Sequence, residues 1–83
     1  MKTIIYTQSA AKDFDKLPAQ VQEAVERALS EYAIYGTGDV KYLIDRLGSR
    51  LRIGRYRVIF DEDQVTVLAF YIGKRDTGTY RRN

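Results

Sequence analysis

The sequence has no cysteine and no histidine among its 83 residues, and it has a single proline. Without cysteine no disulfide can form, and without either residue there is no Cys/His cluster to hold a structural metal. We therefore expect a fold that uses no metal and no cofactor. The absence of cysteine also fits a reducing compartment.

A long apolar stretch is missing as well. The apolar run near the start, residues 1–6, is far too short for a signal peptide or a membrane span. There are no internal repeats, low-complexity segments or linkers, so residues 1–83 predict one domain. We expect this domain to be cytoplasmic and to bind no membrane. Its core must be thin, because so small a domain buries only about 60–65% of its unfolded surface.

The net charge of +3 is unevenly distributed. Residues 1–40 carry four basic and six acidic side chains, whereas residues 41–83 carry ten basic and five acidic ones. A basic second half indicates a polyanionic partner. The alternative is an ordinary solvated basic surface.

The first half predicts a strand and two helices. Thr3–Thr7 is rich in β-branched residues and predicts a strand. Ser9 can cap a helix with an apolar face made of Ala10, Phe14 and Leu17. Pro18 ends that helix and starts a second one, which Gly36 ends. The apolar face of the second helix comprises Val21, Ala24, Val25, Ala28, Leu29 and Tyr32.

The second half predicts strands. Between Gly36 and Gly48 the pattern is irregular, and a short helix and an apolar bridge are both compatible with Val40, Leu43, Ile44 and Leu47. The apolar period then changes to two, which predicts strands at Ser49–Ile53, Tyr56–Asp61 and Val65–Ile72. The expected fold is α+β, in the order βααβββ, with a helical hairpin on one face of an antiparallel sheet.

A hairpin in this half gathers arginines on one face. A two-residue turn at Gly54-Arg55, with glycine first, favours type II′ and places Arg52 opposite Arg57. The face toward the helices then holds Leu51, Ile53, Tyr56, Val58 and Phe60. The other face holds Arg50, Arg52 and Arg57. Opposed like charges destabilise a hairpin, so an anionic ligand would explain them. Three solvated arginines are the alternative.

The third strand of this sheet can extend the arginine face. A three-residue loop, Glu62–Gln64, would set Arg57 opposite Ala69, whereas a two-residue loop would reverse the faces. With the longer loop, the arginine face would also hold Val67, Ala69, Tyr71 and Arg75. Arginines beside an aromatic ring suit single-stranded RNA, although core packing is the alternative for Tyr71. The basic residues 73–83 either continue the site or form a frayed end.

Three segments resemble the RelE/ParE toxin superfamily. Lys12–Pro18 is similar to its K-D-(L/F)-x-K-L-P opening, and Leu47–Phe60 is similar to its L-x-(x)-R-L-R-V-G-x-Y-R-V-I-Y segment. Gly73–Asp76 with Tyr80 resembles the G-K-R-(D/E)…Y ending of the RelE branch. The resemblance spans nearly the whole chain and implies the βααβββ fold, sometimes with an extra strand, in a toxin neutralised by a cognate antitoxin protein.

The RelE resemblance further implies an endoribonuclease that enters the ribosomal A site and cuts mRNA without a metal. The 2′-OH attacks the neighbouring phosphate and leaves a 2′,3′-cyclic phosphate. Arg57 and Arg75 would stabilise the phosphate charge or protonate the leaving oxygen, and Tyr80 would stack on the nucleotide. Arg52 is expected to be catalytic with them, and both Arg50 and Arg52 stand where the best-known RelE toxins have lysines. The expected RNA-binding residues are Arg50, Lys41, Lys74, Arg55, Arg81 and Arg82.

The sequence departs from that pattern in its acid–base groups. Arginine stays charged where a lysine of lowered pKa could act as a base, and histidine is absent. Catalysis would then rest on electrostatic stabilisation and in-line geometry. The segment between Arg75 and Tyr80 is also one residue shorter than in that branch. Two alternatives remain: a ParE-like toxin that inhibits DNA gyrase, and an RNA-binding module without activity.

Overall fold

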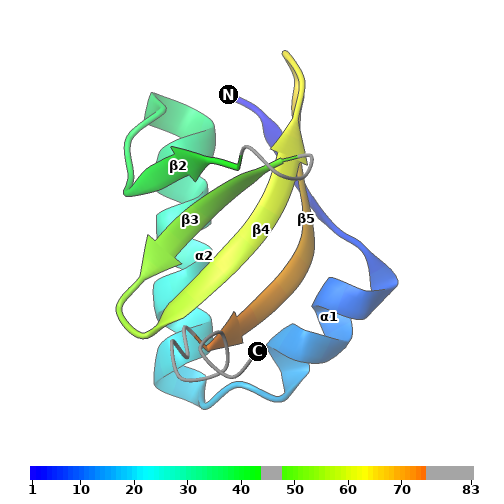
Figure 1. The fold of residues 1–83 in the computed structure, drawn as a ribbon, viewed down its shortest axis with the longest axis vertical. Coiled ribbons are helices and arrows are strands. Elements are labelled where there is room, and N and C mark those ends of the chain that lie inside the picture. Colours follow the sequence, from blue (N-terminus) through cyan, green and yellow to red (C-terminus); the bar gives the residue numbers. More distant parts are fainter. Residues whose placement is uncertain (44–47, 75–83) are drawn as a thin grey trace.

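The computed structural model describes residues 1–43 and 48–74. These residues form two helices and five strands (Figure 1). The elements in chain order are β1 (Thr3–Tyr6), α1 (Gln8–Asp15), α2 (Ala19–Tyr35), β2 (Val40–Tyr42), β3 (Ser49–Ile53), β4 (Tyr56–Glu62) and β5 (Thr66–Lys74).

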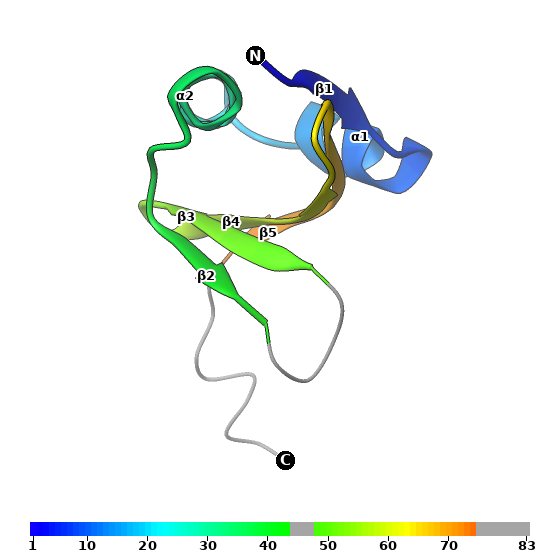
Figure 2. The same ribbon diagram turned by 90° about the horizontal axis from the view of Figure 1, so that it is seen from above.

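The strands form one sheet in the order β1-β5-β4-β3-β2. The β5–β4, β4–β3 and β3–β2 pairs are antiparallel, whereas β1 runs parallel to β5. Both helices lie on the same side of this sheet (Figure 2). The predicted α+β fold is thus confirmed, with β2 as an additional edge strand. Val40 therefore belongs to a strand and packs against the core, so no helix forms at residues 40–42. Ile44 and Leu47 lie outside the described residues.

The start of α1 differs from the prediction. Thr7, not Ser9, is the N-cap residue, because its Oγ1 accepts a hydrogen bond from the Ala10 amide at 3.1 Å. The Thr7 amide in turn donates to the Ala69 carbonyl at 2.9 Å, which holds Thr7 at the end of the sheet. Strand β1 accordingly ends at Tyr6, one residue earlier than predicted.

The helical hairpin turns at Pro18, as predicted. The Pro18 carbonyl accepts hydrogen bonds from the Val21 and Gln22 amides, both at 2.9 Å, which starts α2. Gly36 ends α2 in the left-handed conformation at φ 74°, and its amide donates to Tyr32. Leu17 lies beyond the end of α1 yet still packs against the core.

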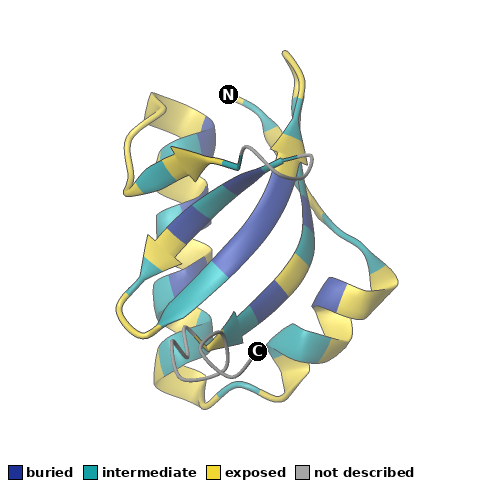
Figure 3. Cartoon of the chain, viewed as in Figure 1, coloured by how far each residue is buried: buried dark blue, intermediate teal, exposed yellow. Residues whose placement is uncertain are grey.

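The core lies between the helices and the sheet, and β4 runs through its middle (Figure 3). Tyr32 packs edge-to-face on Phe60, with ring centroids 5.2 Å apart. The buried core residues are Ala10, Val25, Leu29, Leu51, Val58, Phe60, Val67, Ala69 and Ile72. These residues secure the position of β3, β4 and β5, which carry the site.

Helix α1 supports the second half of β5. Strand β1 pairs with Thr66–Ala69, and beyond Ala69 no strand of the described ranges pairs with β5 on that side. The Asp13 carboxylate of α1 accepts a hydrogen bond from the Ile72 amide at 3.1 Å. This bond satisfies a backbone donor at the edge of β5. It also helps to fix the end of β5, where Gly73 pairs with Arg57 of β4.

Candidate nucleic-acid interface

The hairpin of β3 and β4 has the predicted register. Arg52 pairs with Arg57, and Ile53 pairs with Tyr56 across the turn. Gly54 has φ +58°, and no non-glycine residue in the described ranges has a positive φ. Arg55 therefore has a negative φ, which agrees with a type II′ turn and excludes type I′.

The pairing of β4 with β5 differs from the prediction. Arg57 lies opposite Gly73, not Ala69. Val67 and Ala69 are fully buried in the core, so the prediction that they share the arginine face was wrong. Tyr71 pairs with Ile59, which in turn pairs with Arg50. The predicted placement of Tyr71 on the arginine face is thus confirmed.

A β-bulge explains both outcomes. The register shifts between Ile59 and Phe60, because Ile59 pairs with Tyr71 whereas Phe60 pairs with Ala69. Phe70 is the extra residue on β5, so side chains before and after it alternate with opposite phase. The turn also lies one residue later than predicted, because β4 ends at Glu62 and β5 begins at Thr66, which leaves Asp63–Val65 between the strands. The Asp63 carboxylate accepts hydrogen bonds from the Val65 and Thr66 amides at 2.9 Å.

The side of the sheet that faces away from the helices carries two rows of residues. One row contains Arg52, Arg57 and Gly73, and the other contains Lys41, Arg50, Ile59 and Tyr71. We call these residues the arginine face. No helix or strand within residues 1–43 and 48–74 covers it (Figure 2). Each row contains two basic residues in direct cross-strand register, an unfavourable arrangement for folding.

Asp39 neutralises one of these cations. Its carboxylate contacts the Arg52 Nε at 2.8 Å, and its carbonyl accepts a hydrogen bond from the Arg52 amide at 3.0 Å. The sequence reasoning missed Asp39, because it did not predict the strand at Val40 that brings this residue beside β3. Arg52 is therefore held at a defined place on the arginine face.

The guanidinium group of Arg50 contains a buried nitrogen that lacks a hydrogen-bond acceptor within the described residues. Its Nε is buried and makes no hydrogen bond within residues 1–43 and 48–74, and Lys41 lies directly opposite on β2. A buried donor that lacks an acceptor is unfavourable, and more so when the group is charged. An anionic oxygen bound beside the Arg50 guanidinium would offset the cost of this charge and its repulsion by Lys41.

Tyr71 lies beside Arg57 on the arginine face. The Arg57 Cζ is 6.0 Å from the centroid of the Tyr71 ring, within the range of a cation–π interaction. The ring is 41% exposed, so core packing does not account for it.

The other predicted site residues fall outside this cluster or outside the described ranges. Arg55 is exposed in the turn after Gly54. Lys74 pairs with Tyr56, which places it on the opposite side of the pleat from Arg57. The residues that lie outside the described ranges are Arg75, Tyr80, Arg81 and Arg82.

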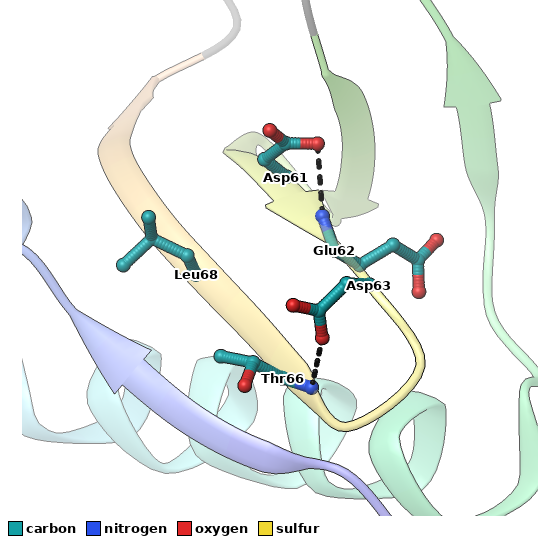
Figure 4. A pocket seen from close by; sticks show the side chains of 5 residues that line it. All are labelled: Asp61, Glu62, Asp63, Thr66 and Leu68. Atoms are coloured by element: carbon teal, nitrogen blue, oxygen red, sulfur yellow. Dashed lines mark hydrogen bonds between the residues drawn. The ribbon is translucent and has the colours of Figure 1, made fainter.

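An acidic pocket lies at the C-terminal end of β4 (Figure 4). It is lined by Asp61, Glu62, Asp63, Thr66 and Leu68. Asp61 accepts a hydrogen bond from the Glu62 amide, and Asp63 binds the turn amides of Val65 and Thr66. Those two backbone hydrogen bonds lower the pKa of Asp63. The Asp63 carboxylate thus closes the turn. No group of three or more candidate metal ligands occurs in the two described ranges.

Comparison with solved structures identifies similar chains. The toxin–antitoxin complex RelBE2 from Mycobacterium tuberculosis contains a chain with 28% identity and a TM-score of 0.76, covering 89% of this chain and 98% of that one. The RelB–RelE complex from Methanococcus jannaschii matches at 16% identity and a TM-score of 0.73, covering 94% and 96%.

The isolated RelE toxin from E. coli is also similar, at 16% identity and a TM-score of 0.65, covering 99% of this chain and 98% of that one. Because that structure holds RelE without its antitoxin, the similarity is to the toxin component. No protein-family model and no curated protein matches the sequence. None of the helices in the described ranges is long and apolar enough to cross a membrane.

Proposed function

This chain belongs to the RelE-like toxin superfamily, and from that premise we propose that it is a toxin that cuts mRNA on the ribosome. The observation that supports this activity is the arginine face. It sets Arg52 against Arg57 and Lys41 against Arg50, and no described residue supplies an acceptor to the buried Arg50 Nε. An RNA backbone supplies the phosphate oxygens that such a surface lacks.

In the proposed reaction the 2′-OH of the RNA attacks the adjacent phosphorus, and the bond to the 5′-oxygen of the next nucleotide breaks. The products are a 2′,3′-cyclic phosphate and a free 5′-hydroxyl. Arg57 stabilises the negative charge that develops on the phosphate oxygens, and Arg52 and Arg50 bind the neighbouring backbone. Arg75 and Tyr80 are proposed to complete the site as the resemblance implies.

Partners follow from the same proposal. A ribosomal target places the toxin in the cytoplasm, and its neutralising partner would be a cognate antitoxin. The similar complexes from M. tuberculosis and M. jannaschii contain RelB antitoxins. We propose that this antitoxin wraps the helical hairpin and shields the basic residues of the second half.

A translating extract tests the activity. Purified toxin is added to an extract that translates a defined mRNA, and primer extension maps new 5′ ends. We expect cuts with the wild type and a loss of at least a hundredfold in Arg57→Ala. Lys12→Ala, which removes an exposed cation on α1, serves as the matched control and should cut like the wild type.

Other outcomes would contradict the proposal in different ways. Cuts that persist in Arg57→Ala would remove the arginine face from the reaction. If no cuts appear and DNA gyrase supercoiling is blocked instead, the chain is a ParE-like inhibitor. If neither occurs but RNA still binds, the chain is a binding module without activity.

A further inference from the structure

Tyr71 is an aromatic residue whose position the core does not explain. Its neighbour Ile72 is 3% exposed and packs in the core, whereas Tyr71 is 41% exposed on the opposite side of the sheet. Without the bulge at Phe70, continuation of the Phe60–Ala69 register would pair Tyr71 with Val58 and turn it toward the core. The bulge therefore exposes this ring on the arginine face.

Gly73 provides the space in which the ring lies. A Cβ atom built on Gly73 would overlap the Tyr71 hydroxyl and its Cζ, so the ring passes directly over the Gly73 backbone. The backbone at Gly73 does not require glycine, because its φ lies outside the positive range found at Gly36, Gly38, Gly48 and Gly54. The need for glycine at this position is thus one of space for the ring.

Arg57 stands next to this arrangement. It pairs directly with Gly73 across β4 and β5, and its Cζ is 6.0 Å from the centre of the Tyr71 ring. Arg52 lies opposite on the other side and repels it, while Asp39 binds Arg52. Of the two facing guanidinium groups, one is thus bound by the Asp39 carboxylate and the other lies beside the Tyr71 ring.

We propose that Tyr71, seated over Gly73, is a positioning residue that holds the Arg57 guanidinium where the scissile phosphate binds. This inference rests on the proposed function. A long arginine side chain samples many rotamers, and an electrostatic group is effective only when it is already aimed at the developing charge. The aromatic face supplies that restraint, and its hydroxyl is not required.

Four variants separate the ring from its surroundings. Tyr71→Phe keeps the ring, Tyr71→Leu removes it, and Gly73→Ala displaces it while leaving Tyr71 in the chain. Tyr35→Leu makes the same change at a tyrosine that is 73% exposed at the end of α2, and it serves as the matched control. Thermal unfolding of each variant verifies that it is folded.

An NMR measurement tests the contact without activity. In the wild type the ring current of Tyr71 should shift the side-chain signals of Arg57, which are assigned by their loss in Arg57→Lys. The shift should remain in Tyr71→Phe and Tyr35→Leu and disappear in Tyr71→Leu and Gly73→Ala. Unchanged Arg57 signals in Tyr71→Leu would overturn the proposal, whether or not the protein cuts mRNA.

A kinetic measurement tests the consequence. With ribosomes carrying a defined mRNA, the maximal cleavage rate should fall on the order of tenfold to a hundredfold in Tyr71→Leu and Gly73→Ala. The half-saturating ribosome concentration should stay within about twofold, because Arg57 itself is still present. In an Arg57→Ala background, Tyr71→Leu should cause no further loss.

The outcomes distinguish the two proposals. A wild type that cuts no mRNA contradicts the proposed function, and the NMR shift then decides whether Tyr71 holds Arg57. A wild type that cuts, with equal further losses in both backgrounds, shows that Tyr71 acts independently of Arg57 and overturns the inference. Lost activity in Tyr71→Phe would transfer the role to the hydroxyl and also overturn it.

Discussion

The two faces of the β3–β4 hairpin differ in what they contribute. On the side toward the helices, Leu51, Val58 and Phe60 are at most 1% exposed and form the centre of the core. On the other side, the same strands set Arg52 against Arg57, and the buried Arg50 Nε has no hydrogen-bond partner among residues 1–43 and 48–74. Adjacent residues of one strand thus form the core on one face and the proposed ligand-binding surface on the other.

This separation follows from the geometry of a strand. Successive side chains point to opposite faces, so a single register assigns every residue of β3 and β4 to one role. Substitutions on the helix side should lower stability first. Substitutions of the basic residues on the arginine face should change RNA binding and leave the fold intact, or stabilise it.

The largest effect is expected at the centre of the core. Phe60→Ala removes a fully buried ring that packs on Tyr32, and it should lower the free energy of unfolding by about 3–5 kcal/mol. Arg57→Ala, three residues away on the other face of β4, should change it by less than about 0.5 kcal/mol. Urea unfolding of both variants measures the contrast. Comparable losses would show that the two faces do not have separate roles.

Lys2, Tyr32 and Glu62 form a polar cluster at the end of β4. Its contribution to stability should depend on pH, unlike that of the apolar core. Burial would raise the pKa of Glu62, but hydrogen bonds from Lys2 and Tyr32 outweigh it and lower that pKa. The folded state therefore resists protonation, so this contribution is present above the unfolded pKa of Glu62 and is lost as pH falls through the folded value. Glu62→Gln should remove about 1–2 kcal/mol at pH 7 and flatten the acid limb in urea unfolding. An unchanged acid limb would contradict the assignment.

The same cluster has an alkaline limb. Burial, the hydrogen bond to Glu62 and the charge of that carboxylate raise the pKa of Tyr32 to about 12. Because the folded pKa exceeds the unfolded value of about 10, stability is fully present below pH 10 and is lost as pH rises toward 12. Tyr32→Phe should lose less stability than the wild type over that range, as monitored by circular dichroism. Equal losses in both proteins would exclude Tyr32 as the cause.

A smaller effect of opposite sign is expected on the arginine face. Arg50→Thr removes the buried Nε and the repulsion from Lys41, and it places a β-branched residue in a strand, so the free energy of unfolding should rise by about 0.5 kcal/mol. Binding of single-stranded RNA should weaken, and the slope of log affinity against log salt should decrease by about 0.7. A loss of stability would indicate that the arginine stem matters more as packing than as charge.

The elements predicted correctly from the sequence depend on local signals. The turn at Gly54 follows from a glycine that can adopt positive φ, and the alternation on either side of it is unambiguous. Helix α2 shows a strong helical period between a proline and a glycine. Because the arginines lie within a few residues of that turn, their mutual placement was predictable as well.

The features that the sequence reasoning missed depend on contacts between distant segments. Whether Thr7 or Ser9 caps α1 is decided by the bond from Thr7 to Ala69. The bulge at Phe70 lets β5 place Ala69 and Ile72 in the same core, a demand that no local pattern displays. Strand β2 has only three residues, too few for a periodic signal, so its neighbour Asp39 was missed with it.

Asp39 yields the smallest expected effect and tests how far the arginine face depends on the carboxylate that binds Arg52. Both side chains of this pair are largely exposed, at 41% and 57%, so Asp39→Asn should lower stability by less than about 1 kcal/mol. The substitution adds one net positive charge to the face and releases Arg52 for a phosphate. RNA affinity should therefore rise a few-fold at low salt, with a steeper dependence on salt concentration, when measured by fluorescence anisotropy. Weaker binding would mean that the carboxylate aims Arg52 at the RNA, so that a fixed direction matters more on this face than an added charge.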